Sequence, residues 1–225
     1  MCFPTRAAMR RLFLPWSVPI GTDVELSLVQ LPGRGQRMGE DLPTDLEETA
    51  LAIAAEIYAE ATEDFVFFGH SMGAVLALEV VRVATLRQIQ VPRLIVVSGS
   101  NWPGRHVHEP LHELRDTQLI DRLREMGGTP REVLENTELM QLVLPILRAD
   151  FAMLYRYRYR AEAAVKSALH VFAGRNDRHV NTAHLADWMQ ETQAPGNLHL
   201  FDGGHFFVHG QETAILNKLR ELMAL

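Results

Sequence analysis

The sequence is poor in cysteine, and Cys2 is the only one among its 225 residues. A single thiol cannot form a disulfide within the chain. Such cysteine usage is typical of proteins in reducing compartments, so we expect a cytoplasmic protein.

The sequence also lacks a long apolar run. No stretch reaches the ~18 residues of a membrane-spanning helix, and we expect no membrane partner. The segment Arg10-Arg11-Leu12-Phe13-Leu14 is similar to the core of a twin-arginine export signal. However, the apolar segment and the small-residue cleavage site of such a signal do not follow, which makes export the less favoured interpretation.

Basic residues are not in excess. The chain has 22 Lys and Arg against 28 Asp and Glu, which gives a formal net charge of -6. This balance argues against a nucleic-acid partner. A chain of this length can bury about 70–75% of its unfolded surface in one core. We therefore expect a single domain over residues 1–225. A monomer is the default expectation for its oligomeric state.

Strand-like and helix-like segments alternate along the chain. Strands are predicted at 24–31, 65–69, 94–100, 168–174 and 198–204, and helices at 45–61, 74–88, 186–192 and 212–225. This order predicts an α/β fold, with a mostly parallel sheet and helices on both faces. Between about 110 and 155 the periodicity is helical, with breaks at Gly127-Gly128 and Pro130. We expect a helical lid insertion there; an extra packing helix pair is the alternative.

The most informative stretch is Gly69-His70-Ser71-Met72-Gly73, a G-x-S-x-G motif. It follows an apolar strand and opens a helix, as a nucleophile elbow does. Glycines flank the sharp turn because a side chain there would crowd it. The turn places the Met72 amide at the helix N-terminus, where developing negative charge is favoured. The motif predicts Ser71 as nucleophile and the Met72 amide as an oxyanion donor.

A serine nucleophile needs a base, and on this fold an acid and then a histidine follow the serine, each after a later strand. Asp177 follows the predicted strand at 168–174, and His205 follows the one at 198–204. We predict that His205 is the general base and later the general acid. Asp177 is predicted to fix its tautomer and to stabilise the imidazolium.

Other residues compete for these roles. His209 is the main alternative base, and Asp202, three residues before His205, is the alternative acid. His70 is expected to support the elbow, and His199 lies within a predicted strand.

Two further clusters contain residues that could bind ligands. His106, His108 and His112 have a spacing that could bind a metal, but no completed ligand set accompanies them, and a solvated loop is favoured. The segment 155–160 alternates tyrosine and arginine. We interpret it as the exit of the helical insertion with one face buried; an arginine that binds an anionic substrate or partner is the alternative. We expect neither a metal nor a cofactor.

Short motifs along almost the whole chain resemble those of one family. They are CFP at 2–4, PW at 15–16, VQLPGRGQR at 29–37, FFGHSMGA at 67–74, SGS at 98–100, ADF at 149–151, YRY at 157–159 and GGHFF at 203–207. In these the sequence resembles the type II thioesterases that accompany nonribosomal peptide and polyketide synthases. They are relatives of the thioesterase that releases medium-chain acyl groups in fatty acid synthesis.

The resemblance implies an α/β-hydrolase fold with Ser71, Asp177 and His205 as the triad and a helical lid over a substrate channel. It implies hydrolysis of acyl thioesters on the phosphopantetheine arm of a carrier protein, for editing or release. Carrier domains are thus the expected partners. A general esterase of the same fold and a catalytically impaired carrier-binding protein are the alternatives. Five apolar residues of the insertion could line an acyl channel or only pack: Leu139, Met140, Leu142, Val143 and Leu144.

The N-terminus departs from the family pattern. The family has a strand before CFP and a glycine-rich loop after it, whose backbone supplies the second oxyanion amide. Here Met1 precedes Cys2, and residues 5–11 replace the glycines. We expect a truncated first strand and, by alignment, assign the second donor to the Arg6 amide. Loss of one such donor costs about 10²–10³ in rate.

Overall fold

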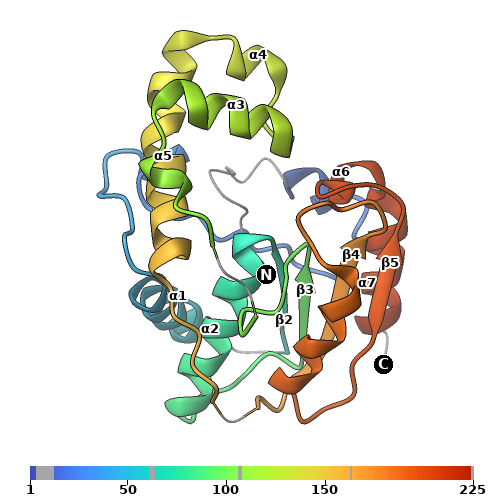
Figure 1. Cartoon of the computed structure of the whole chain (residues 1–225). Helices are drawn as coiled ribbons and strands as arrows, with labels where there is room; N and C mark the ends of the chain where they lie inside the picture. Colours follow the sequence, from blue (N-terminus) through green and yellow to red (C-terminus); the bar gives the residue numbers. More distant parts are fainter. Residues whose placement is uncertain (4–12, 61–63, 106–107, 163, 224–225) are drawn as a thin grey trace.

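The computed structural model describes residues 1–3, 13–60, 64–105, 108–162 and 164–223 (Figure 1). Arg6 and His106 lie outside these ranges. The strands are β1 (Cys2–Phe3), β2 (Val66–His70), β3 (Leu94–Ser98), β4 (Ala168–Gly174) and β5 (Leu198–Phe201). They form one sheet in the order β1-β2-β3-β4-β5, and every neighbouring pair is parallel.

Helices cover both faces of the sheet, as predicted. On one face lie α1 (Leu46–Glu60), α2 (Met72–Leu86) and the 3-10 helix η5 (Thr182–Glu191). On the other lie η2 (Leu14–Ser17), α6 (Phe207–Gly210) and α7 (Glu212–Met223). Cover on both faces explains why the middle strands are apolar runs without polar alternation. No helix in the described part of the chain is long and apolar enough to cross a membrane.

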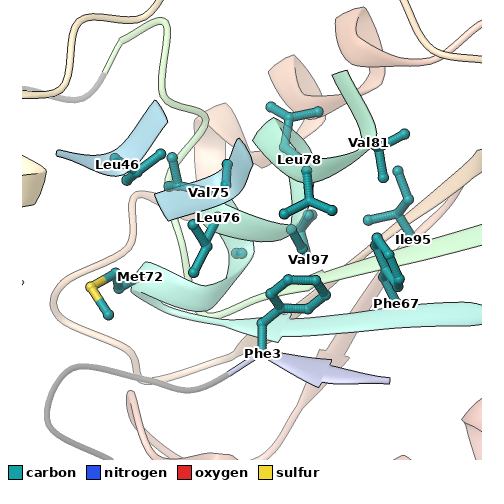
Figure 2. Close-up of a cluster of buried hydrophobic side chains, with 14 of the residues drawn as sticks. Phe3, Leu46, Phe67, Met72, Val75, Leu76, Leu78, Val81, Ile95 and Val97 are labelled. Carbon is teal, nitrogen blue, oxygen red and sulfur yellow. The ribbon is translucent and has the colours of Figure 1, made fainter. Parts of the chain in front are cut away.

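The core under α2 is formed by side chains from the middle strands. Figure 2 shows Phe67 of β2 and Ile95 and Val97 of β3 pointing toward Leu76 and Leu78 of α2. Each of these five side chains is at most 1% exposed. α2 is therefore apolar on most of its circumference, and its first residue is fixed at the end of β2.

The segment between β3 and β4 is helical. It contains the 3-10 helix η4 (Leu111–Glu113), then α3 (Asp116–Met126), α4 (Arg131–Leu134) and α5 (Thr137–Arg156). The break after α3 falls at Gly127 and Gly128, whose φ angles are 71° and 83°. These helices form an apolar cluster of their own, made of Leu111, Leu119, Leu123, Leu134, Met140, Leu144, Leu147 and Phe151. In Figure 1, α3 and α4 lie beyond one end of the sheet.

The predicted strand at 24–31 is wrong. There the structure has only an isolated bridge between Leu28 and Cys2. The Cys2 amide donates to the Ser27 carbonyl, and the Val29 amide donates to the Cys2 carbonyl. A strand forms only along a neighbouring ladder, and β1 offers two residues. Among the described residues, this segment therefore has only the two-residue strand β1 beside it, and its β-rich composition does not produce a strand.

Candidate active site

Ser71 lies in the turn between β2 and α2, in a strained backbone conformation. Its φ and ψ are 55° and -119°, and Gln88 is the only other non-glycine residue with positive φ among those described. Its amide donates to the carbonyl of Ser98 on β3. A Cβ added at Gly69 would lie 2.1 Å from the Gly73 carbonyl oxygen, so the turn excludes a side chain there. This geometry is that of a nucleophile elbow.

His205 connects Ser71 to Asp177. Its Nε2 lies 3.2 Å from the Ser71 Oγ, and its Nδ1 lies 2.8 Å from Oδ2 of Asp177. The second carboxylate oxygen accepts the His179 amide at 2.8 Å. An ionised carboxylate can only accept, so Nδ1 carries the proton and Nε2 presents its lone pair to the serine hydroxyl. The structure thus brings together the three residues that the sequence predicted.

The loops after β4 and β5 place these two side chains next to each other. A Cβ added at Gly174 would lie 2.4 Å from the Gly204 carbonyl oxygen, so the two loops meet backbone to backbone. The Asn176 amide donates to the Gly203 carbonyl at 2.9 Å. Both loops follow the carboxyl ends of parallel strands, which meet at one edge of the sheet. That is why Asp177 and His205 are close although 28 residues separate them.

Of the two predicted oxyanion donors, the structure describes one. Met72 is the first residue of α2 and is 1% exposed. Its amide is one of the first-turn N–H groups that have no intrahelical acceptor. The partial positive charge of a helix N-terminus favours an anion beside it. Arg6, the second predicted donor, is outside the described residues.

A cavity of about 280 Å³ opens at Ser71. Its walls come from α2, α3, α5 and the loops after β3 and β4. Beyond Ser71, Met72 and His205 it is lined by Val75, Gly99, Ser100, Asn101, Pro103, His108, Glu109, Leu111, Arg122, Met126, Phe151, Leu154, Arg178, His179 and Val180. The lining includes apolar side chains such as Met126 and Phe151 and the charged side chains of Glu109, Arg122 and Arg178. Most of these residues were not predicted from the sequence, although Arg178 and His179 could have been indicated by their adjacency to Asp177.

Comparison with known proteins places the chain among thioesterases. The thioesterase domain family matches residues 1–223. The chain belongs to the thioesterase family. The linear gramicidin dehydrogenase LgrE of Brevibacillus parabrevis is 33% identical over 211 residues, which cover 91% of this chain and 80% of that protein. The thioesterase PikA5 of Streptomyces venezuelae is 31% identical over 227 residues, 98% of this chain and 79% of that protein.

Solved thioesterase structures share the fold. RedJ, a thioesterase of the prodiginine pathway of Streptomyces coelicolor, superimposes with a TM-score of 0.92 at 31% identity, covering 97% of this chain and 87% of that chain. YbtT, a type II thioesterase of the yersiniabactin pathway, gives 0.89 at 28% identity and covers 98% and 90%. The predicted α/β-hydrolase fold and the resemblance to type II thioesterases are therefore confirmed.

In this thioesterase family member, the alternative base His209 and the alternative acid Asp202 are not among the residues that line the cavity at Ser71. His209 is exposed, and its ring centroid lies 6.4 Å from that of Phe206. Asp202 is exposed and pairs with Arg175 at 3.3 Å. Neither side chain lines the cavity, so the structure favours His205 and Asp177 as base and acid.

His70 lies beneath the elbow. It is fully buried, and its Nδ1 lies 2.9 Å from the Ser98 Oγ. Gly99, with φ 56°, passes so close that an added Cβ would lie 2.4 Å from the His70 ring. His70 therefore packs β2 against the end of β3, behind the nucleophile. His199 lies in β5, as expected, and its Nε2 is 2.9 Å from Nδ1 of His170.

The structure describes two of the three clustered histidines, His108 and His112, and the whole tyrosine-arginine segment at 155–160. His108 lines the cavity, and the His112 ring lies 5.0 Å from that of Tyr155. In the segment 155–160 the tyrosines are half-buried and the arginines exposed, so one face is buried as predicted. Tyr157 and Tyr159 each donate a 2.7 Å hydrogen bond, to Glu79 and Glu191 respectively.

Cys2 is not a second nucleophile. Its side chain is buried in the sheet, and this burial raises the pKa of the thiol to about 11. A thiol with so high a pKa is almost entirely protonated at neutral pH, whereas the thiolate is the reactive form.

Proposed function

We propose that this protein is a type II thioesterase that hydrolyses acyl thioesters held on the phosphopantetheine arm of carrier-protein domains. The observation that carries the proposal is the hydrogen-bonded series Ser71–His205–Asp177 at the floor of a cavity in a thioesterase-family chain. The pathways named for RedJ and YbtT support carrier domains as partners.

In the first half of the reaction, the Ser71 Oγ attacks the thioester carbonyl carbon while His205 Nε2 takes its proton. The carbonyl oxygen becomes an oxyanion beside the Met72 amide and, in this proposal, the Arg6 amide. The C–S bond then breaks and leaves an acyl ester on Ser71. A thiol has a pKa near 8.5, so the sulfur can leave as a thiolate. It then takes the proton from His205 Nε2, which returns His205 to its neutral form before the second half begins.

In the second half, His205 takes a proton from water as the water oxygen attacks the acyl-Ser71 carbonyl. The C–O bond to the serine breaks, the serine recovers its proton from His205, and a carboxylic acid is released. Asp177 stabilises the imidazolium in both halves. In the same proposal the chain is one domain, and the helices between β3 and β4 act as a lid, since Met126 of α3 and Phe151 and Leu154 of α5 line the cavity at Ser71.

The test uses a carrier domain loaded with an acyl-phosphopantetheine, and p-nitrophenyl acetate as a free ester. The wild-type protein should release the acyl group from the carrier with a much higher kcat/KM than it shows toward the ester. Ser71→Ala should lower kcat by about 10⁴-fold or more, because the nucleophile is lost. Ser100→Ala, which removes another hydroxyl from the same cavity, is the matched control and should retain most activity.

Two results would contradict the proposal. Comparable kcat/KM values for the free ester and the carrier thioester would indicate a general esterase. Carrier binding without turnover would indicate the impaired carrier-binding protein. Thermal unfolding of both variants confirms that the comparison is made on folded protein.

A further inference from the structure

The loop at 31–35 directs the side chain of Arg34 into the protein interior. Arg34 is 0% exposed. Gly33 and Gly35 on either side have φ angles of 74° and 57°, a region that favours glycine. A Cβ added at Gly33 would lie 2.3 Å from the Leu42 side chain. The loop conformation that buries Arg34 thus depends on the two glycines.

Arg34 forms a bidentate ion pair with Asp150 of α5. Its two terminal nitrogens each lie 2.8 Å from a different carboxylate oxygen, and Asp150 is also 0% exposed. A buried ion pair of this kind adds little net stability over apolar side chains of the same volume, because desolvation offsets the attraction. The ion pair instead fixes the position of Asp150 relative to Arg34, because the two guanidinium nitrogens fit the two carboxylate oxygens in one orientation.

Asp150 lies where α5 passes from the helical insertion to the main core. Phe151 and the residues before it pack in the cluster of the insertion, whereas Met153 and Leu154 pack in the core under α1 and α2. Phe151 and Leu154, one and four residues after Asp150, both line the cavity at Ser71. A shift or rotation of α5 at Asp150 would therefore move an apolar wall of the cavity.

We infer that Arg34 is a positioning residue that sets the acyl-group selectivity of this cavity. Its ion pair with Asp150 fixes α5 so that Phe151 and Leu154 limit the space beside Ser71. Loss of the pair lets this wall move, and longer acyl groups then gain relative to short ones. The inference rests on the proposed thioesterase function.

The experiment compares kcat/KM for an acetyl and an octanoyl thioester of the same thiol. The variants are Arg34→Lys and the double variant Arg34→Met with Asp150→Leu. The double variant removes both charges together, so no buried charge is left unpaired and the fold is preserved. Arg34→Lys keeps the charge but cannot make the bidentate contact. The ratio of the two kcat/KM values is independent of the fraction of active protein, so reduced stability alone cannot change it.

We expect the acetyl-to-octanoyl ratio to fall by about fivefold to 100-fold in the double variant and by less in Arg34→Lys. Leu216→Ala is the control, because it creates a cavity in the apolar cluster on the α7 face, and no described member of that cluster lines the cavity at Ser71. It should lower the unfolding temperature and leave the ratio unchanged. An unchanged ratio in both Arg34 variants would overturn the inference while the proposed function stands. A wild-type protein without thioesterase activity would overturn both.

Discussion

At the scale of single residues, the chemistry depends on how each side chain is held. The strained turn fixes the position of Ser71. The Asp177 carboxylate orients the His205 ring with one oxygen and accepts the His179 N–H with the other. The identities of Ser71, Asp177 and His205 could be predicted because each follows a strand in a fixed chain order. The Arg34–Asp150 pair could not be derived in the same way. Its members are 116 residues apart, and no local pattern relates them.

Asp177→Asn should lower kcat by about 10³–10⁴-fold at neutral pH. The amide can still accept the His179 N–H, so the loop keeps its shape, but it no longer holds the proton on Nδ1 of His205. Steady-state kinetics on an acyl-carrier thioester measure the loss. Asp202→Asn is the control, since Asp202 is exposed and pairs only with Arg175 among the contacts described. Activity lost in Asp202→Asn and retained in Asp177→Asn would reverse the assignment of the acid.

At the scale of elements, the apolar runs predicted β2, β3 and β4 within a residue or two because their residues are buried on both faces. The segment 24–31 has the composition of a strand but not the partner, and pairing is a long-range property. The cavity walls were not predictable for a related reason. The packing of α3 and α5 over the sheet decides which of their apolar residues face Ser71, and the 3.6-residue period alone does not fix it.

The β4–β5 pair contains a pH-dependent contact. His170 Nδ1 and His199 Nε2 lie 2.9 Å apart, within hydrogen-bond distance, and both pKa values are lowered, first by burial and then by nearby positive charge. Lys218 and Glu221 of α7 are the charged groups that act on this pair. The unfolded chain takes up protons near pH 6.5, above the folded pKa values. The unfolded state therefore binds more protons below that pH, and stability must fall as the pH drops through this window.

Urea unfolding at pH 7.5 and 5.5 measures this effect. The wild-type free energy of unfolding should decrease more between the two pH values than that of His199→Gln, which can still form a hydrogen bond but does not titrate. Equal decreases in the two proteins would show that the pair does not contribute to the acid sensitivity.

In the molecule as a whole, the ends of the strands hold the three predicted catalytic residues, and α3 and α5 of the helical insertion line the cavity at Ser71. Ser71, Asp177 and His205 all come from the carboxyl ends of strands packed between two layers of helices. The insertion has its own apolar cluster and joins the main core near Asp150. In the proposed mechanism, Ser71, Asp177 and His205 can therefore stay fixed while a movement of the insertion changes the walls of the cavity.

The acyl-Ser71 intermediate can be detected directly. The protein is mixed with an acyl-carrier thioester, quenched in acid within milliseconds, digested and analysed by mass spectrometry. We expect an adduct of the acyl mass on the peptide that contains Ser71. In Ser71→Ala we expect no adduct, and turnover lowered by about 10⁴-fold or more. Full turnover by Ser71→Ala, or an acyl adduct on a different residue, would rule out Ser71 as the nucleophile.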